Sequence, residues 1–181
     1  AEAGKAGLRT LIVSNGWILE EPLKDLLEVL GAVKVDLKAY TEKFYKEVCG
    51  GELKPVLETL KRLRKKGTWT EIVVLIGPTL NDGEGEIRGL ARFVKNDLGL
   101  SRVVVLDDQT TYGRGLADQF EKKFKELGGE VLKHEGITQG EKDFMPLLTK
   151  IRSVKPELIF FGGIYPEMAL LLKQSKKIGL A

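Results

Sequence analysis

Two spacings of hydrophobic residues alternate along the chain. Short runs rich in β-branched residues are each followed by a turn and then by a stretch with apolar residues three and four positions apart. The first pattern is typical of strands and the second of helices. The strand pattern occurs six times, at residues 10–14, 32–37, 71–76, 102–106, 131–135 and 158–162. The helix pattern occurs at residues 22–30, 53–66, 84–97, 113–127, 144–153 and 166–177.

This alternation predicts a parallel sheet covered by helices. Crossovers between parallel strands are right-handed, so six such units can form an open sheet or part of a barrel. A closed barrel of this kind has eight strands. We therefore expect a single α/β domain over residues 1–181 with one open, doubly wound, flavodoxin-like sheet and helices on both faces. The first seven residues, rich in alanine and glycine, predict at most a frayed turn.

Composition excludes several classes of function. The formal net charge is +3 with 29 basic and 26 acidic residues, and a nucleic-acid footprint needs basic residues segregated on one face. A lone cysteine, Cys49, excludes an intramolecular disulfide and a thiolate metal cage, and a lone histidine, His134, excludes a two-histidine metal site. No stretch approaches the roughly 20 apolar residues of a membrane span, and no signal-peptide core begins the chain. We expect no metal, no nucleic-acid or membrane partner, and a cytoplasmic location.

Candidate functional residues follow the predicted strands, because ligands of parallel α/β proteins lie beyond the carboxyl ends of the strands. We expect all six clusters to share one rim. They are residues 14–16, 36–38, 78–82, 107–112, 136–138 and 162–165. Asp107 and Asp108 fit either a weak site for a hard cation or acidic residues of a turn and a helix start. His134 lies within a strand pattern, which favours an edge or solvent-facing position over catalysis.

The first half of the chain carries one set of motifs. They are residues 11–17 (LIVSNGW), 33–38 (VKVDLK), 49–51 (CGG), 78–82 (PTLND) and 87–93 (IRGLARF). Together they resemble the pyruvate formate-lyase activating enzymes, a family of radical S-adenosylmethionine proteins. The resemblance implies that residues 1–98 are a barrel fragment in which Ser14, Asn15, Asp36 and Lys38 line a pocket for S-adenosylmethionine.

Radical chemistry is nevertheless not expected from these residues. The family's three-cysteine loop is not among them, and one cysteine cannot ligate a four-iron cluster. For Asp36 and Lys38 the alternative is a solvated ion pair on the rim, which contributes little to stability. We expect no cofactor.

The second half carries a different set of motifs. They are residues 103–117 (VVVLDDQTTYGRGLA), 136–144 (GITQGEKDF) and 160–168 (FFGGIYPEM). These resemble one lobe of a periplasmic leucine/isoleucine/valine-binding protein over residues 99–181. The resemblance implies that Tyr112 and Tyr165, with Thr111 beside them, face the amino acid in a cleft between two lobes. A single lobe buries less of the ligand, so we expect weak binding at most.

These two resemblances predict an engineered chimera without catalytic activity, in which barrel and receptor fragments are recombined in one α/β scaffold. A join in the helix near residues 93–98 preserves the alternation of strands and helices. The alternative is a weak binding module for a branched-chain amino acid. The barrel fragment brings an edge strand that had a neighbour in its parent, and unpaired edges recruit other chains. Self-association through a sheet edge is therefore also expected.

Overall fold

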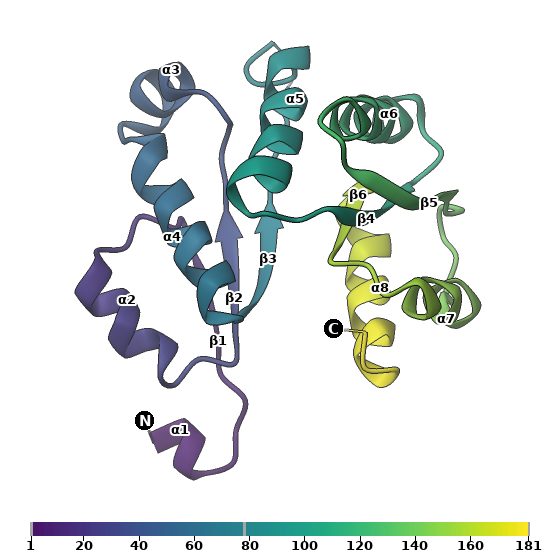
Figure 1. Ribbon diagram of the computed structural model, residues 1–181. Coiled ribbons are helices and arrows are strands. Elements are labelled where there is room, and N and C mark those ends of the chain that lie inside the picture. Colours follow the sequence, from purple (N-terminus) through teal and green to yellow (C-terminus); the bar gives the residue numbers. More distant parts are fainter. Residues whose placement is uncertain (1, 78, 181) are drawn as a thin grey trace. The chain divides into compact units, whose positions relative to one another are not determined.

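The chain folds as two compact units, Ala1–Glu86 and Ile87–Ala181, in a computed structural model that describes residues 2–77 and 79–180 (Figure 1). All strand pairs among the described residues are parallel, so the predicted α/β class is confirmed. The strands form two sheets of three, ordered β1-β2-β3 and β5-β4-β6, and not the one continuous sheet that we expected. That the two units behave as a single domain stays a prediction.

The strands lie close to their predicted positions. They are β1 (Leu11–Ser14), β2 (Ala32–Asp36), β3 (Trp69–Val73), β4 (Arg102–Asp107), β5 (Glu130–Gly136) and β6 (Leu158–Gly162). The third strand begins two residues earlier than predicted, because its register with β2 starts at the pair Ala32 and Trp69.

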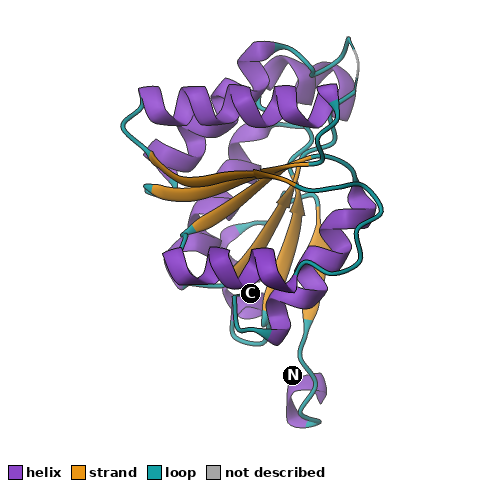
Figure 2. Ribbon diagram, turned by 90° about the vertical axis from the view of Figure 1, so that its right-hand side faces the viewer, coloured by secondary structure: helices purple, strands orange, loops and turns teal. Residues whose placement is uncertain are grey.

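Helices separate the strands throughout. They are α1 (Glu2–Lys5), α2 (Glu20–Leu27), α3 (Glu42–Phe44), α4 (Leu53–Lys66), α5 (Glu84–Arg92), α6 (Thr111–Glu126), α7 (Met145–Val154) and α8 (Tyr165–Lys177). Two π-helical turns, η1 (Tyr45–Cys49) and η2 (Phe93–Asp97), continue α3 and α5. The α3–η1 segment was not predicted. The short helix α1 buries no residue and projects away from the β1–β3 sheet on an extended segment (Figure 2).

In the first unit, helices α2 and α4 pack on one face of the sheet (Figure 1). The central strand β2 contributes Val33 and Val35 to this face, and both are fully buried. The helix α4 places apolar residues three and four positions apart, including Leu60 and Leu63, against them. It ends at Gly67, whose φ of 76° is the left-handed conformation that commonly closes a helix.

In the second unit, helices cover both faces of the sheet, as predicted. Figure 1 shows α6 on one face and α7 and α8 on the other. Beneath α6, Phe120 is fully buried and stacks on Phe160 of β6 with ring centroids 4.1 Å apart. Beneath α7 and α8, a core cluster includes Leu106, Leu148 and Leu171. Alternate residues of β4 thus pack into two separate apolar layers, one on each face of the sheet.

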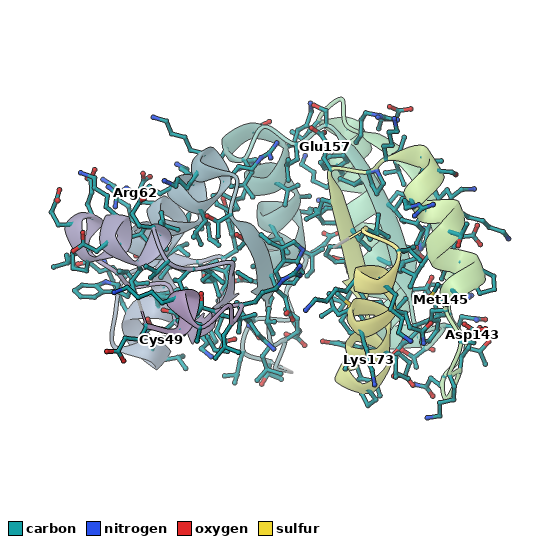
Figure 3. The ribbon with its side chains drawn as sticks, turned by 90° about the horizontal axis from the view of Figure 1, so that it is seen from below. Cys49, Arg62, Asp143, Met145, Glu157 and Lys173 are labelled. Carbon is teal, nitrogen blue, oxygen red and sulfur yellow. The ribbon has the colours of Figure 1, made fainter. Side chains whose placement is uncertain are left out.

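Loop side chains fix the starts of several elements in this unit. Glu157, labelled in Figure 3, accepts hydrogen bonds from the backbone N–H groups of Ser101 and Arg102 at the start of β4, at 2.8 and 2.9 Å. Asp143 accepts one from the N–H of Met145, the first residue of α7, at 3.0 Å (Figure 3). No helix among residues 2–77 and 79–180 combines the length and the apolar character needed to cross a bilayer.

Candidate functional site

The six candidate clusters follow the strands of two sheets, three clusters in each, so they do not share the carboxyl edge of one sheet as we expected. In the first unit the residues of the expected S-adenosylmethionine pocket have partners within their own segments. The hydroxyl of Ser14 accepts a hydrogen bond from the N–H of Gly16, and the side chain of Asn15 accepts one from the N–H of Trp17, both at 3.0 Å. These contacts are turn contacts that stabilise the chain after β1.

Asp36 and Lys38 form an ion pair with each other. Their carboxylate and ammonium groups lie 2.9 Å apart, and the side chains are 33% and 44% exposed. This is the arrangement that the rim ion-pair alternative predicted. The register pairs Ser14 with Val35, so Ser14 shares the helix-covered face with Val35, whereas Asp36 follows on the opposite face. The four residues are therefore not brought to one face of the sheet.

Two further residues stabilise this rim: Asn81, which lies in the candidate cluster 78–82, and Tyr45, which sequence reasoning did not single out. Asn81 is buried, and its side chain donates to the carbonyl oxygens of Lys38 and Leu75 and accepts from the N–H of Gly77. The hydroxyl of Tyr45 accepts from the N–H of Lys38 at 3.1 Å, and burial raises the pKa of Tyr45 above its usual value. Pro78 lies outside the described residues. This rim is stabilised by buried amide and hydroxyl groups that already have partners.

In the second unit, the turn between β4 and α6 is built on two aspartates. One oxygen of Asp108 accepts hydrogen bonds from both the N–H and the hydroxyl of Thr110, at 3.1 and 2.6 Å. The same hydroxyl accepts from the N–H of Gly113 at 2.9 Å and so caps α6. Asp107 accepts from the N–H of Gln109 at 2.7 Å. The pair therefore acts as turn and helix-start residues, and the described residues contain no group of three side chains suited to a metal ion.

An open hollow of about 250 Å³ lies beside this turn. Its lining residues are all polar: Asp108, Gln109, Thr110, Thr138 and Gln139. Thr111 and Tyr112 begin α6 next to it, and the side chain of Tyr112 is 47% exposed. The side chain of Tyr165 lies outside what the structure describes, although its backbone begins α8. A small, polar and open hollow offers no buried apolar surface for a leucine side chain.

The loop after β5 is held by α8. Glu167, in the first turn of that helix, accepts a hydrogen bond from the N–H of Gly140 at 3.1 Å. The side chain of Gln174 accepts from the N–H of Phe144 at 2.8 Å and donates to the carbonyl of Lys142 at 2.7 Å. The motifs GITQGEKDF and FFGGIYPEM are therefore joined by a side-chain-to-backbone contact. These contacts hold the loop whose residues Thr138 and Gln139 line the hollow.

His134 occupies the edge strand β5, as predicted, with its side chain 23% exposed. Its Nε2 atom lies 3.2 Å from an oxygen of Asp107, and its Nδ1 atom contacts Glu121 of α6. Sequence reasoning missed this cluster, because the three residues come from β4, α6 and β5.

Two family models match the chain. The one described as the Radical SAM superfamily covers residues 1–94, and the one described as Periplasmic binding protein covers residues 75–181. Each match includes more than half of the 181 residues. The chain belongs to both families and is a chimera of the two. The matches overlap at residues 75–94, which include all of α5.

Individual relatives agree with this identification for the second part of the chimera. An "Amino acid binding protein" of Pseudomonas aeruginosa is 40% identical over 100 residues, and a "Leu/Ile/Val-binding protein homolog 1" of Brucella abortus is 35% identical over 100 residues. Each match covers 55% of the chimera and 26% of the relative. The chimera therefore spans about a quarter of the length of these relatives.

Solved structures of both kinds share the fold. A domain of a pyruvate-formate lyase-activating enzyme from Bacteroides vulgatus matches with a TM-score of 0.54 and 14% identity, over 73% of the chimera and 84% of that chain. The leucine-binding protein LivK from Thermotoga maritima matches with a TM-score of 0.52 and 24% identity, over 84% of the chimera and 43% of that chain. At these identities the likeness concerns the fold alone.

Proposed function

We propose that the chimera was engineered to recombine a barrel fragment with a receptor fragment and has no catalytic activity of its own. The observation that supports this most directly is that the matches to the two families overlap only at residues 75–94, around helix α5, while the strand–helix alternation continues across this segment. Both families supply parallel strands with helical crossovers, so a helix is the element where such fragments join with least disturbance. A cytoplasmic location and the absence of a nucleic-acid partner belong to the same proposal.

The residues of the radical S-adenosylmethionine part support the absence of turnover. The single cysteine, Cys49, is exposed at the end of η1 (Figure 3), and a four-iron cluster needs several thiolates. Binding of S-adenosylmethionine at Ser14, Asn15, Asp36 and Lys38 would have to replace the hydrogen bonds and the ion pair that these side chains make with their own segments. We propose that the cofactor does not bind measurably.

The experiment is a thermal unfolding scan of the purified chain, with its mass measured by light scattering, with and without millimolar leucine and S-adenosylmethionine. A ligand that binds only the native state raises the transition temperature by mass action. We expect a cooperative transition that neither compound moves. A clear upward shift with S-adenosylmethionine, or any turnover, would refute the proposal. Light scattering also tests self-association, for which the four-residue edge strand β1, with Leu11 and Val13 exposed, is our proposed site.

A second candidate function is weak binding of a branched-chain amino acid at the rim of the second unit. It is favoured by the identity of 34–40% to relatives named for amino-acid binding and by the positions of Thr111, Tyr112 and Tyr165 at the start of α6 and α8. The double substitution Tyr112→Ala and Tyr165→Ala should abolish a calorimetric leucine signal. Trp17→Ala, at an exposed aromatic of the other unit, is the matched control. A leucine signal that survives the double substitution would contradict binding at this rim.

A further inference from the structure

The single histidine of the chain lies between two carboxylates that come from different elements. His134 is on β5, Asp107 is at the end of β4, and Glu121 is on α6. The imidazole Nε2 lies 3.2 Å from Asp107 Oδ2, and Nδ1 contacts Glu121 Oε2. The two acidic side chains are only 4% and 18% exposed. One side chain thus links a strand to both elements that pack against it on this face.

The number of protons on the three groups decides which hydrogen bonds they can make. An ionised carboxylate only accepts hydrogen bonds, and a neutral imidazole carries one N–H, whereas an imidazolium carries two. A neutral His134 can donate to one carboxylate and must then direct a lone pair at the other. Only the imidazolium donates to both Asp107 and Glu121. Hydrogen bonds of this charge-assisted kind are about twice as strong as neutral ones.

The outer oxygens of both carboxylates are engaged as well. Asp107 Oδ1 accepts from the N–H of Gln109 at 2.7 Å and lies 3.8 Å from Nε of Arg114. Glu121 Oε1 contacts the ammonium group of Lys125. Neither carboxylate can therefore turn away from the imidazole without losing a second contact. Two acids, Asp107 and Glu121, and the bases Arg114 and Lys125 that contact them thus lie around His134 on β4 and α6.

The two charged residues next to His134 in β5, Lys133 and Glu135, face the other side of the sheet. The register pairs Lys133 with Val104 and Glu135 with Leu106, and both of these β4 residues belong to the core on the α7 side. His134 is paired with Val105, on the α6 side. Because β5 is an edge strand with β4 as its only neighbour in the described sheet, its contact with α6 depends on this face.

We propose that His134 is a pH-sensitive latch that ties the edge strand β5 to β4 and α6 while the imidazole is protonated. When the ring loses a proton, one of its two nitrogens no longer donates a hydrogen bond, and its lone pair then faces a carboxylate. The edge strand then opens more readily.

The first test uses the unaltered protein. Because the chain has one histidine, its two ring nitrogens give a single set of signals in a long-range ¹H–¹⁵N spectrum. At pH 6 we expect both nitrogens to be protonated and both N–H protons to exchange slowly with water. A neutral tautomer at pH 6, with one nitrogen of the acceptor type, would overturn the proposal.

The second test measures the opening of the strand. Hydrogen exchange of the β5 amides, corrected for the intrinsic pH dependence of exchange, should show severalfold weaker protection at pH 8 than at pH 5.5. In His134→Gln this pH dependence should disappear, while Lys133→Gln, which changes a charge on the opposite side of the same strand, should retain it. Parallel behaviour of the unaltered protein and His134→Gln would refute the latch, and so would its loss in Lys133→Gln alone.

Discussion

The same substitution, glycine to alanine, should have opposite effects at two positions of α6 that lie two residues apart. A Cβ atom at Gly115 would meet no other atom within 4 Å. A Cβ atom at Gly113 would overlap the carboxylate of Asp108 and lie 2.6 Å from the carbonyl oxygen of Gly162. The helix and the end of β6 therefore approach each other closely only because residue 113 has no side chain.

The two magnitudes follow from these surroundings. In a helix, alanine is more favourable than glycine by about 0.5–1 kcal/mol, so Gly115→Ala should stabilise the protein by that amount. Gly113→Ala has the same favourable effect on the helix, but the added methyl group overpacks the contact with β6, which costs about 1–3 kcal/mol. It also displaces the buried carboxylate of Asp108 from Thr110, and hydrogen bonds to a charged group contribute about 1.5–3 kcal/mol. The net loss should be about 1.5–5.5 kcal/mol.

Urea unfolding followed by circular dichroism measures both effects on the same scale. The free energy of unfolding should differ by about 2.5–6 kcal/mol between the two variants, with the unaltered protein between them, because the overpacking and the lost hydrogen bonds affect only Gly113→Ala. Gly113→Ser, with a still larger side chain, should be no more stable than Gly113→Ala. If Gly113→Ala were as stable as Gly115→Ala, the close approach of α6 and β6 would be wrong.

Three further predictions concern the second unit. Phe120→Ala removes a fully buried ring that stacks on Phe124 and Phe160 and should lower the free energy of unfolding by about 3–5 kcal/mol. As a control, Trp17→Ala removes a side chain that is 53% exposed and should change the free energy of unfolding by about 0.5 kcal/mol or less in the same urea titration. Thr110→Ala removes the cap of α6 and should cost about 1–2 kcal/mol, of which Thr110→Ser should restore most. Burial opposes ionisation of Glu121, but hydrogen bonds from Lys125 and His134 outweigh the effect of burial and hold the pKa of Glu121 below its usual 4.5. The ionised carboxylate therefore stabilises the fold above pH 4.5, and this stabilisation is lost as the pH falls through the lower pKa of the folded protein. Glu121→Gln should therefore make acid unfolding less steep, and an unchanged acid profile would contradict this.

Local pattern was enough to locate most elements. The helix Leu53–Lys66 and the strand Leu158–Gly162 have the predicted bounds, because each has a clear periodicity and a turn residue at its end. The segment Glu42–Cys49 was missed, since a three-residue helix followed by a π-helical turn shows no repeat long enough to detect.

The sequence predicted where the candidate site residues lie along the fold better than it predicted which residues they contact. The sequence placed Asp107 and Asp108 at the end of a strand, and both lie there. It did not reveal that Asp107 faces His134, or that Glu167 and Gln174 hold the loop that carries Thr138. Those contacts join residues roughly thirty positions apart, whose proximity depends on strand order and register.

By itself the sequence determined the alternation of strands and helices, their parallel arrangement and the two families that the chain combines. These properties depend on local spacing of apolar residues and on contiguous motifs. Only the tertiary structure decided that six strands form two sheets of three, that Asp36 pairs with Lys38, and that His134 lies between two carboxylates. Strand pairing and side-chain proximity arise from contacts between distant segments, and the same local pattern is compatible with more than one such set of contacts.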